Sequence, residues 1–287
     1  MLTRRSAIAC FAATAVSPYA FIDDSAGLAY TLRALESRSK GRLGIAVQLP
    51  SGKYAQLRGN ERFPMCSTFK FLAAALVLER VDQGKEHLNR TISYSKADLV
   101  PYSPATEKQA SMSMTVGELC KAALTLSDNT AANLLLASFG GPPAITAFAR
   151  SIGDQTTRLD RNETSLNDAT PGDPRVTTTP NAMLRNLESI LFKNVLRAES
   201  RQQLTTWMLA NTKGDAKFRA GLASGWKVAD KTGAGDHGTN NDIGVLWTPA
   251  GKPILITSYL TGTTLSTDEA NAIHAEVARA VAASYQA

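Results

Sequence analysis

The stretch "RFPMCSTFKFLAAALVLERV", residues 62–81, predicts the helix around which the chain folds. From Phe71 to Leu78 every residue is apolar, which is typical of a helix buried on all sides in a large core. Its first turn nevertheless holds Ser67 and Lys70, and burial of an ammonium group is costly unless the group is paired or loses its proton. A lysine at the start of a core helix therefore suggests that this turn carries chemistry.

The composition is that of a globular protein, because 44% of the 287 residues are hydrophobic and 20% are charged. No repeat, low-complexity tract or linker divides the chain, so we expect one compact unit of one or two lobes. Without Arg4 and Arg5, which lie in the predicted leader, the formal charge falls from +6 to 29 basic minus 25 acidic residues, or +4. The basic residues are scattered, which argues against nucleic-acid binding.

The first twenty residues, "MLTRRSAIACFAATAVSPYA", have the layout of an export signal, with paired arginines, no acid and a short apolar region. The arginine pair is also compatible with twin-arginine export. Pro18 and Tyr19 leave the cleavage site near Ala20 poorly specified. The rest of the chain has no apolar run of membrane-spanning length. We expect a signal peptide at 1–20 and a single domain at 21–287 that is periplasmic or secreted, with no membrane attachment after cleavage.

Cysteine and histidine usage gives no sign of a metal site or a cofactor. Cys66 and Cys120 remain after removal of the leader, and each is expected to behave as a small buried apolar residue. His87, His237 and His274 are far apart in the sequence and lack metal-ligand spacing. We expect neither a metal nor a cofactor.

Strand patterns lie at both ends of the chain, and helical patterns fill the middle. A helix is predicted at 26–39 and a hairpin at 42–59, and three strands at 226–232, 241–249 and 253–261 precede an amphipathic helix with Ser266 or Thr267 as its N-cap. The helical patterns between them cover 67–82, 115–126, 129–138, 142–152, 180–192 and 199–211.

This order predicts an α+β fold, in which an antiparallel sheet built from both termini is covered by the terminal helices. The α/β lobe would comprise about 26–60 and 212–287, and the helical lobe about 61–211, with the site in the cleft between them. Residues 158–180 show no long secondary structure. Because a loop of this length in a compact domain is usually functional or disordered, and this one is rich in turn residues, we expect an ordered Ω-type loop.

Ser67 and Lys70 share one face of their helix at i and i+3, so a desolvated lysine could take the proton of the serine hydroxyl. The pattern S-x-x-K alone is weak evidence, since it occurs four times in the chain. The copy at Ser67 differs from the others because it opens a long apolar helix.

Two further groups could complete such a site. Ser127 and Asn129 form a turn that could relay a proton to a leaving nitrogen and hold a substrate carbonyl. Glu163 and Asn167 lie in the Ω-type loop, where a carboxylate and an amide could orient and deprotonate a water molecule.

A third group follows a predicted strand in "DKTGAGDHG", residues 230–238. Lys231 and Thr232 suit an anionic substrate carboxylate, and Gly233 permits close approach to the backbone. The N–H group of Ala234 could serve as an oxyanion donor. Alone, each of these patterns has an ordinary structural explanation as a turn or a solvated charge.

The combination of S-x-x-K, S-D-N and K-T-G in this order resembles the signature of class A β-lactamases and penicillin-binding proteins. The resemblance to a class A serine β-lactamase covers about residues 26–285, including "ERFPMCSTFK", "SDNTAANLLL", "RLDRNETSLN" and "DKTGAGDHGTNND". It implies a helical lobe, a five-stranded antiparallel sheet, and hydrolysis of the β-lactam amide of penicillins and cephalosporins.

The resemblance also implies the role of each residue. Ser67 would form an acyl-enzyme, after Lys70, or Glu163 acting through water, accepts its proton. Ser127 would protonate the departing nitrogen, and Glu163 with Asn167 would activate the deacylating water. The remaining residues would bind the substrate or the oxyanion: Asn129, Lys231, Thr232, Gly233, Ala234 and Tyr102, the last as the aromatic wall of the cleft.

The sequence departs from the family at three positions. Val176 stands where relatives carry the aspartate that closes the Ω-type loop by pairing with Arg161, so we expect a looser loop, with altered oxyimino-cephalosporin handling or slower deacylation. Asn240 replaces a frequent arginine, and Lys217 is expected to take over part of its role toward the substrate carboxylate. Gly235 replaces the cysteine that partners the residue before the nucleophile in one carbapenem-hydrolysing group, which argues against carbapenemase activity.

Two alternatives stay open from the sequence. A penicillin-binding DD-peptidase shares the first three motifs but lacks a deacylating glutamate, and a non-hydrolytic β-lactam receptor would remain acylated. Glu163 argues against the peptidase, and the absence of a membrane segment argues against the receptor. We expect a monomer with a small β-lactam as its ligand.

Overall fold

The computed structural model describes residues 25–286, so the predicted signal peptide at 1–20 lies outside the described residues. Its centre is a five-stranded antiparallel sheet in the order β2-β1-β9-β8-β7. The strands are β1 (Arg42–Gln48), β2 (Tyr54–Leu57), β7 (Lys227–Gly235), β8 (Thr239–Trp247) and β9 (Pro253–Thr261). The first and last parts of the chain therefore form one sheet, and the α+β prediction is confirmed.

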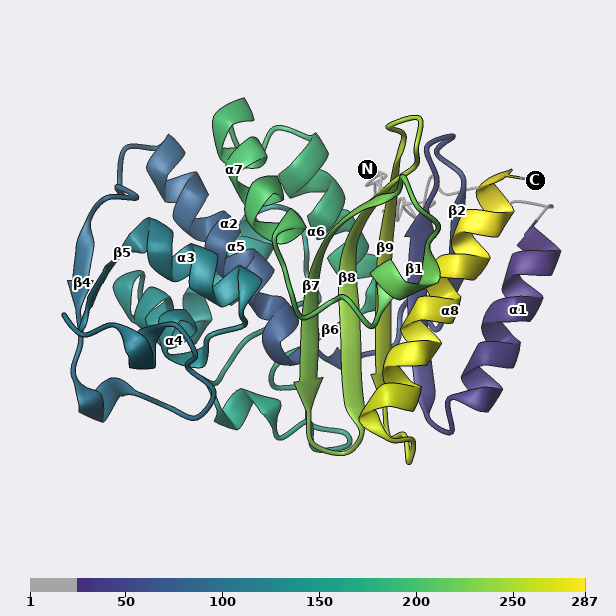
Figure 1. Ribbon diagram of the computed structural model, residues 1–287, viewed down its shortest axis with the longest axis horizontal. Coiled ribbons are helices and arrows are strands. Elements are labelled where there is room, and N and C mark those ends of the chain that lie inside the picture. The colour runs from purple at the N-terminus through teal and green to yellow at the C-terminus, as the bar shows by residue number, and fades with distance from the viewer. Residues whose placement is uncertain (1–24, 287) are drawn as a thin grey trace, which may run out of the picture.

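One face of the sheet is covered by the terminal helices, α1 (Ser25–Arg38) and α8 (Thr267–Gln286), which lie side by side (Figure 1). Leucine, isoleucine and valine side chains from these helices and from the sheet form one apolar cluster between the two layers. Ser266 is the N-cap of α8, because its Oγ accepts from the N–H of Glu269 at 3.3 Å while the Glu269 carboxylate accepts from the N–H of Ser266 at 2.8 Å.

The helical lobe is built around α2 (Phe69–Asp82), whose first ten residues, Phe69 to Leu78, are all buried. Helices α3, α4, α5 and α7 pack around it, and α6 covers the inner face of the sheet. The apolar run of the sequence is therefore buried on every side. The surrounding helices are α3 (Val116–Thr125), α4 (Asn129–Ser138), α5 (Pro142–Ser151), α6 (Pro180–Phe192) and α7 (Ala198–Leu209).

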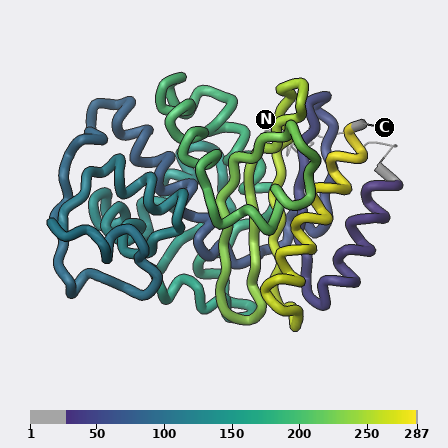
Figure 2. Tube along the Cα trace, viewed as in Figure 1, coloured from purple at the N-terminus to yellow at the C-terminus, as the bar shows by residue number. Residues whose placement is uncertain are grey.

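Several short elements were not predicted. Two-stranded pairs join β3 (Phe63–Pro64) to β6 (Thr177–Thr178), and β4 (Thr91–Ser93) to β5 (Ser113–Thr115). Single 3₁₀ turns also occur, at Cys66–Thr68, Lys96–Asp98, Thr106–Lys108, Ser165–Asn167 and Phe218–Gly221. Figure 2 shows the consequence for the site: the chain leaves the sheet, builds the helical lobe and returns to the sheet, so that the two lobes meet along β7.

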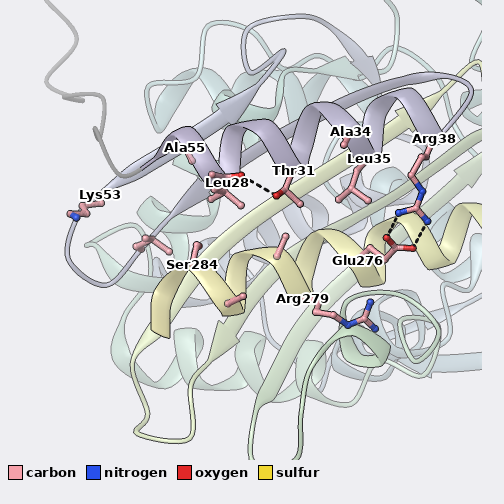
Figure 3. Close-up of a pocket in the computed structure, with 14 residues that line it drawn as sticks. Leu28, Thr31, Ala34, Leu35, Arg38, Lys53, Ala55, Glu276, Arg279 and Ser284 are labelled. Carbon is pink, nitrogen blue, oxygen red and sulfur yellow. Dashed lines mark hydrogen bonds and ion pairs between the residues drawn. The ribbon is translucent and has the colours of Figure 1, made fainter. Parts of the chain in front are cut away.

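A groove of about 670 Å³ runs between α1 and α8 on the outer side of the sheet (Figure 3). Its floor is apolar, with Leu28 and Leu35, and one end is closed by Arg38, which binds both carboxylate oxygens of Glu276 at 2.5 and 2.8 Å. None of the residues predicted to act in catalysis or substrate binding lines it. Four of the predicted site residues, Lys231 to Ala234, lie instead on β7.

Candidate active site

Ser67 lies in the 3₁₀ turn that leads into α2, and its side chain is almost entirely buried. Neighbouring strands hold this turn, since Asn241 Nδ2 donates to the carbonyl oxygens of Pro64 at 2.9 Å and Met65 at 3.2 Å. A Cβ atom on Gly233 would lie 2.8 Å from the Met65 oxygen, so β7 can approach the turn only with glycine at this position. The missing side chain of Gly233 therefore leaves room for the backbone of the turn that carries Ser67. The sequence had suggested that it leaves room for a ligand.

Lys70 is completely buried, as the sequence had suggested, and four acceptors surround its ammonium group, three of them within 3.0 Å. Nζ donates to Asn129 Oδ1 at 2.7 Å and to the Ser127 carbonyl at 2.8 Å, and it lies 3.0 Å from Glu163 Oε1. Burial lowers the pKa of Lys70, and the Glu163 carboxylate opposes that shift. The lysine is therefore held in a fixed position with its proton less firmly bound than in water.

Glu163 links the nucleophile to the lysine. Ser67 Oγ donates to Glu163 Oε1 at 3.1 Å, the same oxygen that pairs with Lys70. Asn167 Nδ2 donates to the other oxygen, Oε2, at 2.6 Å. Asn133 fixes the Glu163 backbone in both directions, accepting from its N–H at 2.9 Å and donating to its carbonyl at 2.8 Å. Ser67 and Lys70 thus meet through Glu163, where the sequence had suggested a direct contact.

Ser127 lies between two lysines. Its Oγ accepts from Lys231 Nζ at 3.1 Å and from Lys70 Nζ at 3.3 Å. Burial, reinforced by the positive charge of Lys70, holds the pKa of Lys231 well below its ordinary value. The serine hydroxyl is therefore placed to exchange a proton with either amine.

Asp128 fixes this turn, a role that its turn composition in the sequence did not reveal. The buried carboxylate caps α4 by accepting from the N–H of Ala131 at 2.8 Å. It also accepts from the N–H groups of Ala105 and Thr106, each at 2.9 Å. One carboxylate thus holds both the turn that carries Ser127 and the segment that follows Tyr102.

The remaining residues predicted to bind the substrate differ in exposure: Tyr102, Asn129, Thr232 and Ala234. Asn129 donates through Nδ2 to the Pro101 carbonyl at 2.9 Å, and its N–H donates to the Tyr102 carbonyl at 3.1 Å. Tyr102 is 51% exposed, which suits a side chain that contacts a ligand from outside. Ala234 is exposed on β7, whereas Thr232 is nearly buried.

In the Ω-type loop, Arg161 has partners that the sequence had not indicated, and the expected looser loop stays a prediction. Arg161 is paired despite the valine at 176, since its guanidinium lies 2.7 Å from Asp168 and 3.3 Å from Asp173. Hydrogen bonds from Arg175 lower the pKa of Asp173 to about 2, so this carboxylate is ionised. Val176 is buried, and its φ of 66° is an outlier for a β-branched residue. The neck is thus closed inside the loop, and an effect on substrate handling or deacylation stays a prediction.

Lys217, which was expected to take part in binding the substrate carboxylate, lies beneath the strand edge. Its side chain is only 5% exposed, and Nζ donates to the Asn241 carbonyl at 2.8 Å beside the buried Asp242. Burial lowers the pKa of Lys217 to about 8. This ammonium thus has a backbone acceptor below the surface, and its part in binding a substrate carboxylate stays a prediction. Asn240 is likewise buried and donates to Asn271 at 3.0 Å.

Cys66 and Cys120 are both buried and unpaired, as expected, and burial raises the pKa of each thiol. Cys66 faces the strand edge, where a Cβ atom on Gly235 would lie 2.7 Å from its sulfur. Within residues 25–286 no three metal-ligating side chains come together, and no helix is long and apolar enough to cross a membrane.

Comparison with known proteins agrees with this geometry. A family model described as the β-lactamase enzyme family matches residues 27–285. The β-lactamase CTX-M-97 of Escherichia coli is 49% identical over 231 residues, which cover 80% of this chain and 79% of the relative. The β-lactamase FAR-1 of Nocardia farcinica is 46% identical over 249 residues, covering 86% and 80%. A solved ancestral class A β-lactamase has a TM-score of 0.88 and 58% identity over 89% of this chain and 99% of that one.

The chain therefore belongs to the β-lactamase enzyme family. Within that family it is a class A serine β-lactamase, as its motifs had predicted, and thus a hydrolase of the β-lactam amide bond that confers antibiotic resistance. None of the matches named above is described as a DD-peptidase or a receptor, the two alternatives that the sequence left open.

Proposed function

We propose that hydrolysis of penicillins and cephalosporins by this protein proceeds through an acyl-enzyme on Ser67 that Glu163 deacylates. The observation that carries the proposal is the shared oxygen, because Glu163 Oε1 lies within hydrogen-bond distance of both Ser67 Oγ, at 3.1 Å, and Lys70 Nζ, at 3.0 Å. A buried carboxylate held by Asn167 beside a serine nucleophile is placed to remove a proton from a water molecule on the acyl group.

In acylation, Ser67 Oγ attacks the lactam carbonyl and its proton passes to Lys70 or, through water, to Glu163. The N–H groups of Ser67 and Ala234 stabilise the oxyanion. The C–N bond then breaks, and Ser127 delivers a proton to the departing nitrogen. Contacts of Ser127 with two buried lysines, at 3.1 and 3.3 Å, support this relay, since either lysine can restore its proton.

In deacylation, Glu163 and Asn167 orient a water molecule, and Glu163 takes its proton as the water attacks the ester of Ser67. Asn129 and Tyr102 bind the side chain and body of the drug. Lys231, Thr232 and the β7 edge at Gly233 are proposed to bind its carboxylate. For Lys217 we propose a supporting role beneath this edge, because its ammonium is bound to the strand.

The experiment is a turnover count with a chromogenic cephalosporin. Many turnovers per protein molecule are expected, whereas a receptor or a peptidase would stop after one. We further propose cleavage of a signal at 1–20, export of the 21–287 domain and a monomeric state. Intact mass and light scattering of protein isolated from the periplasm would test these points.

A further inference from the structure

A lysine outside the family motifs, Lys213, lies against the ring of Tyr102. Lys213 is exposed, and its Nζ is 5.1 Å from the centre of the Tyr102 ring. No carboxylate of the described residues lies within ion-pair distance of this ammonium. An exposed cation that rests on an aromatic face keeps most of its donors available to a ligand.

The backbone that carries Lys213 is held to both lobes. In the helical lobe, the N–H and Oγ1 of Thr212 both donate to the Thr125 carbonyl at 3.2 Å, two residues before Ser127. On the sheet side, Asn211 Oδ1 accepts from the N–H of Lys213 at 2.9 Å, while its Nδ2 donates to Asp230 at 2.8 Å. These anchors flank the residues proposed to bind the substrate carboxylate, so Lys213 is fixed beside them.

Two other lysines near the proposed carboxylate site, Lys231 and Lys217, already donate hydrogen bonds to acceptors within the protein. Lys231 is fully buried and bound to Ser127 Oγ and to the Thr232 carbonyl, at 3.1 and 2.7 Å. Lys217 is bound to a backbone carbonyl and is 5% exposed. An anionic substrate approaching from solvent therefore meets Lys213 before it meets either of them.

We propose that Lys213 is a further substrate-binding residue, which attracts and contacts the carboxylate of the β-lactam at the cleft mouth while Tyr102 holds its ammonium in place. This inference rests on the proposed function, because it concerns the same cleft. The contact is made equally in the ground state and in the transition state, so its loss should raise KM without lowering kcat. Because the ammonium is exposed, added salt should weaken the contact.

The test compares Lys213→Met, Lys213→Arg and, as a matched control, Lys227→Met, which removes an exposed lysine from the far end of β7. With benzylpenicillin at low salt, we expect Lys213→Met to raise KM about two- to fivefold, the range of an exposed ion pair. Lys213→Arg and Lys227→Met should match the wild type. The difference should shrink in about 0.5 M salt and be absent for a penicillin methyl ester, which lacks the carboxylate.

A second measurement separates this inference from the catalytic mechanism. In a Ser67→Ala background, calorimetry with benzylpenicillin should show that adding Lys213→Met raises Kd by the same factor as KM, whereas adding Lys227→Met leaves Kd unchanged. An unchanged KM and Kd in Lys213→Met, an equal change in Lys227→Met, or an equal effect on the methyl ester would each overturn the role of Lys213. Absence of turnover by the wild type, with Kd still dependent on Lys213, would instead refute the mechanism alone.

Discussion

Glu163→Gln should separate the two halves of the reaction. The Glu163 side chain is fully buried, and its oxygens contact Lys70 at 3.0 Å, Ser67 at 3.1 Å and Asn167 at 2.6 Å. Glutamine keeps the shape and the capacity to accept hydrogen bonds, but it cannot remove a proton from water. Loss of a general base costs roughly 10²- to 10⁴-fold in rate, or about 3–5.5 kcal/mol in activation free energy.

The same substitution should spare acylation if Lys70 is the base for that step. The carboxylate of Glu163 raises the pKa of Lys70 against the lowering effect of burial, so its removal lets that pKa fall further. A larger fraction of the lysine is then neutral and able to accept the Ser67 proton. We therefore expect normal adduct formation followed by very slow release.

Intact-protein mass spectrometry and a stopped-flow burst after mixing with a penicillin measure these two steps. Glu86→Gln is the matched control, because Glu86 is also a buried carboxylate with a cationic partner, Arg90 at 2.6 Å, but it lies outside the cleft. Steady turnover at the wild-type rate without an adduct would refute the assignment of the deacylating base. A folded variant that fails to acylate would instead assign acylation to Glu163 as well.

Three further substitutions test other parts of the structure. Val176→Asp should relieve a φ of 66° that strains a β-branched residue, and it should offer Arg161 a third carboxylate beside Asp168 and Asp173, raising stability by about 1 kcal/mol and changing deacylation; an unchanged melting temperature and turnover would contradict this. Gly235→Cys would place its Cβ 2.7 Å from the Cys66 sulfur and 2.5 Å from the Asn167 carbonyl oxygen, so the strand edge must shift; if it does, we expect a disulfide with Cys66 and a lower thiol titre of denatured protein than in the wild type. Burial lowers the pKa of His274 from 6.5 to about 3, so the unfolded chain binds a proton first as pH falls. His274 alone should lower stability by roughly 4–5 kcal/mol between pH 6.5 and 3, and His274→Gln should reduce the pH dependence measured in urea titrations by about this amount.

Much of the fold could be predicted because its signals are local. The apolar run from Phe71 to Leu78 and the apolar segments of the sheet strands identify elements whose burial depends on their own side chains. The short pair of β3 with β6 could not be predicted, since Phe63–Pro64 and Thr177–Thr178 carry no periodic pattern and pair only after the loop has closed. Ser266 as N-cap was found because capping requires residues only three apart.

In the site, too, local features could be predicted from the sequence and long-range contacts could not. Motif residues could be named from their order in the chain, but their contacts depend on segments about sixty to a hundred residues away, as for Lys70 with Asn129 and for Ser67 with Glu163. The hydrogen bond of Lys217 to the Asn241 carbonyl could not be predicted, because the sequence does not show whether a lysine points to solvent or turns beneath the strand. The new partners of Arg161 likewise follow from the path of the loop, which no local pattern specifies.

The buried lysines explain why the site is placed on such an apolar helix. Desolvation lowers the pKa of both Lys70 and Lys231, and it acts only while water is excluded from them. The same exclusion destabilises the folded state, because each ammonium loses its hydration. The nine apolar residues among the ten buried residues of α2 supply apolar burial that offsets this cost, and they also keep water away from Lys70. A polar residue in the middle of α2 should therefore reduce stability and raise the pKa of Lys70 together, an effect that a purely structural helix would not produce.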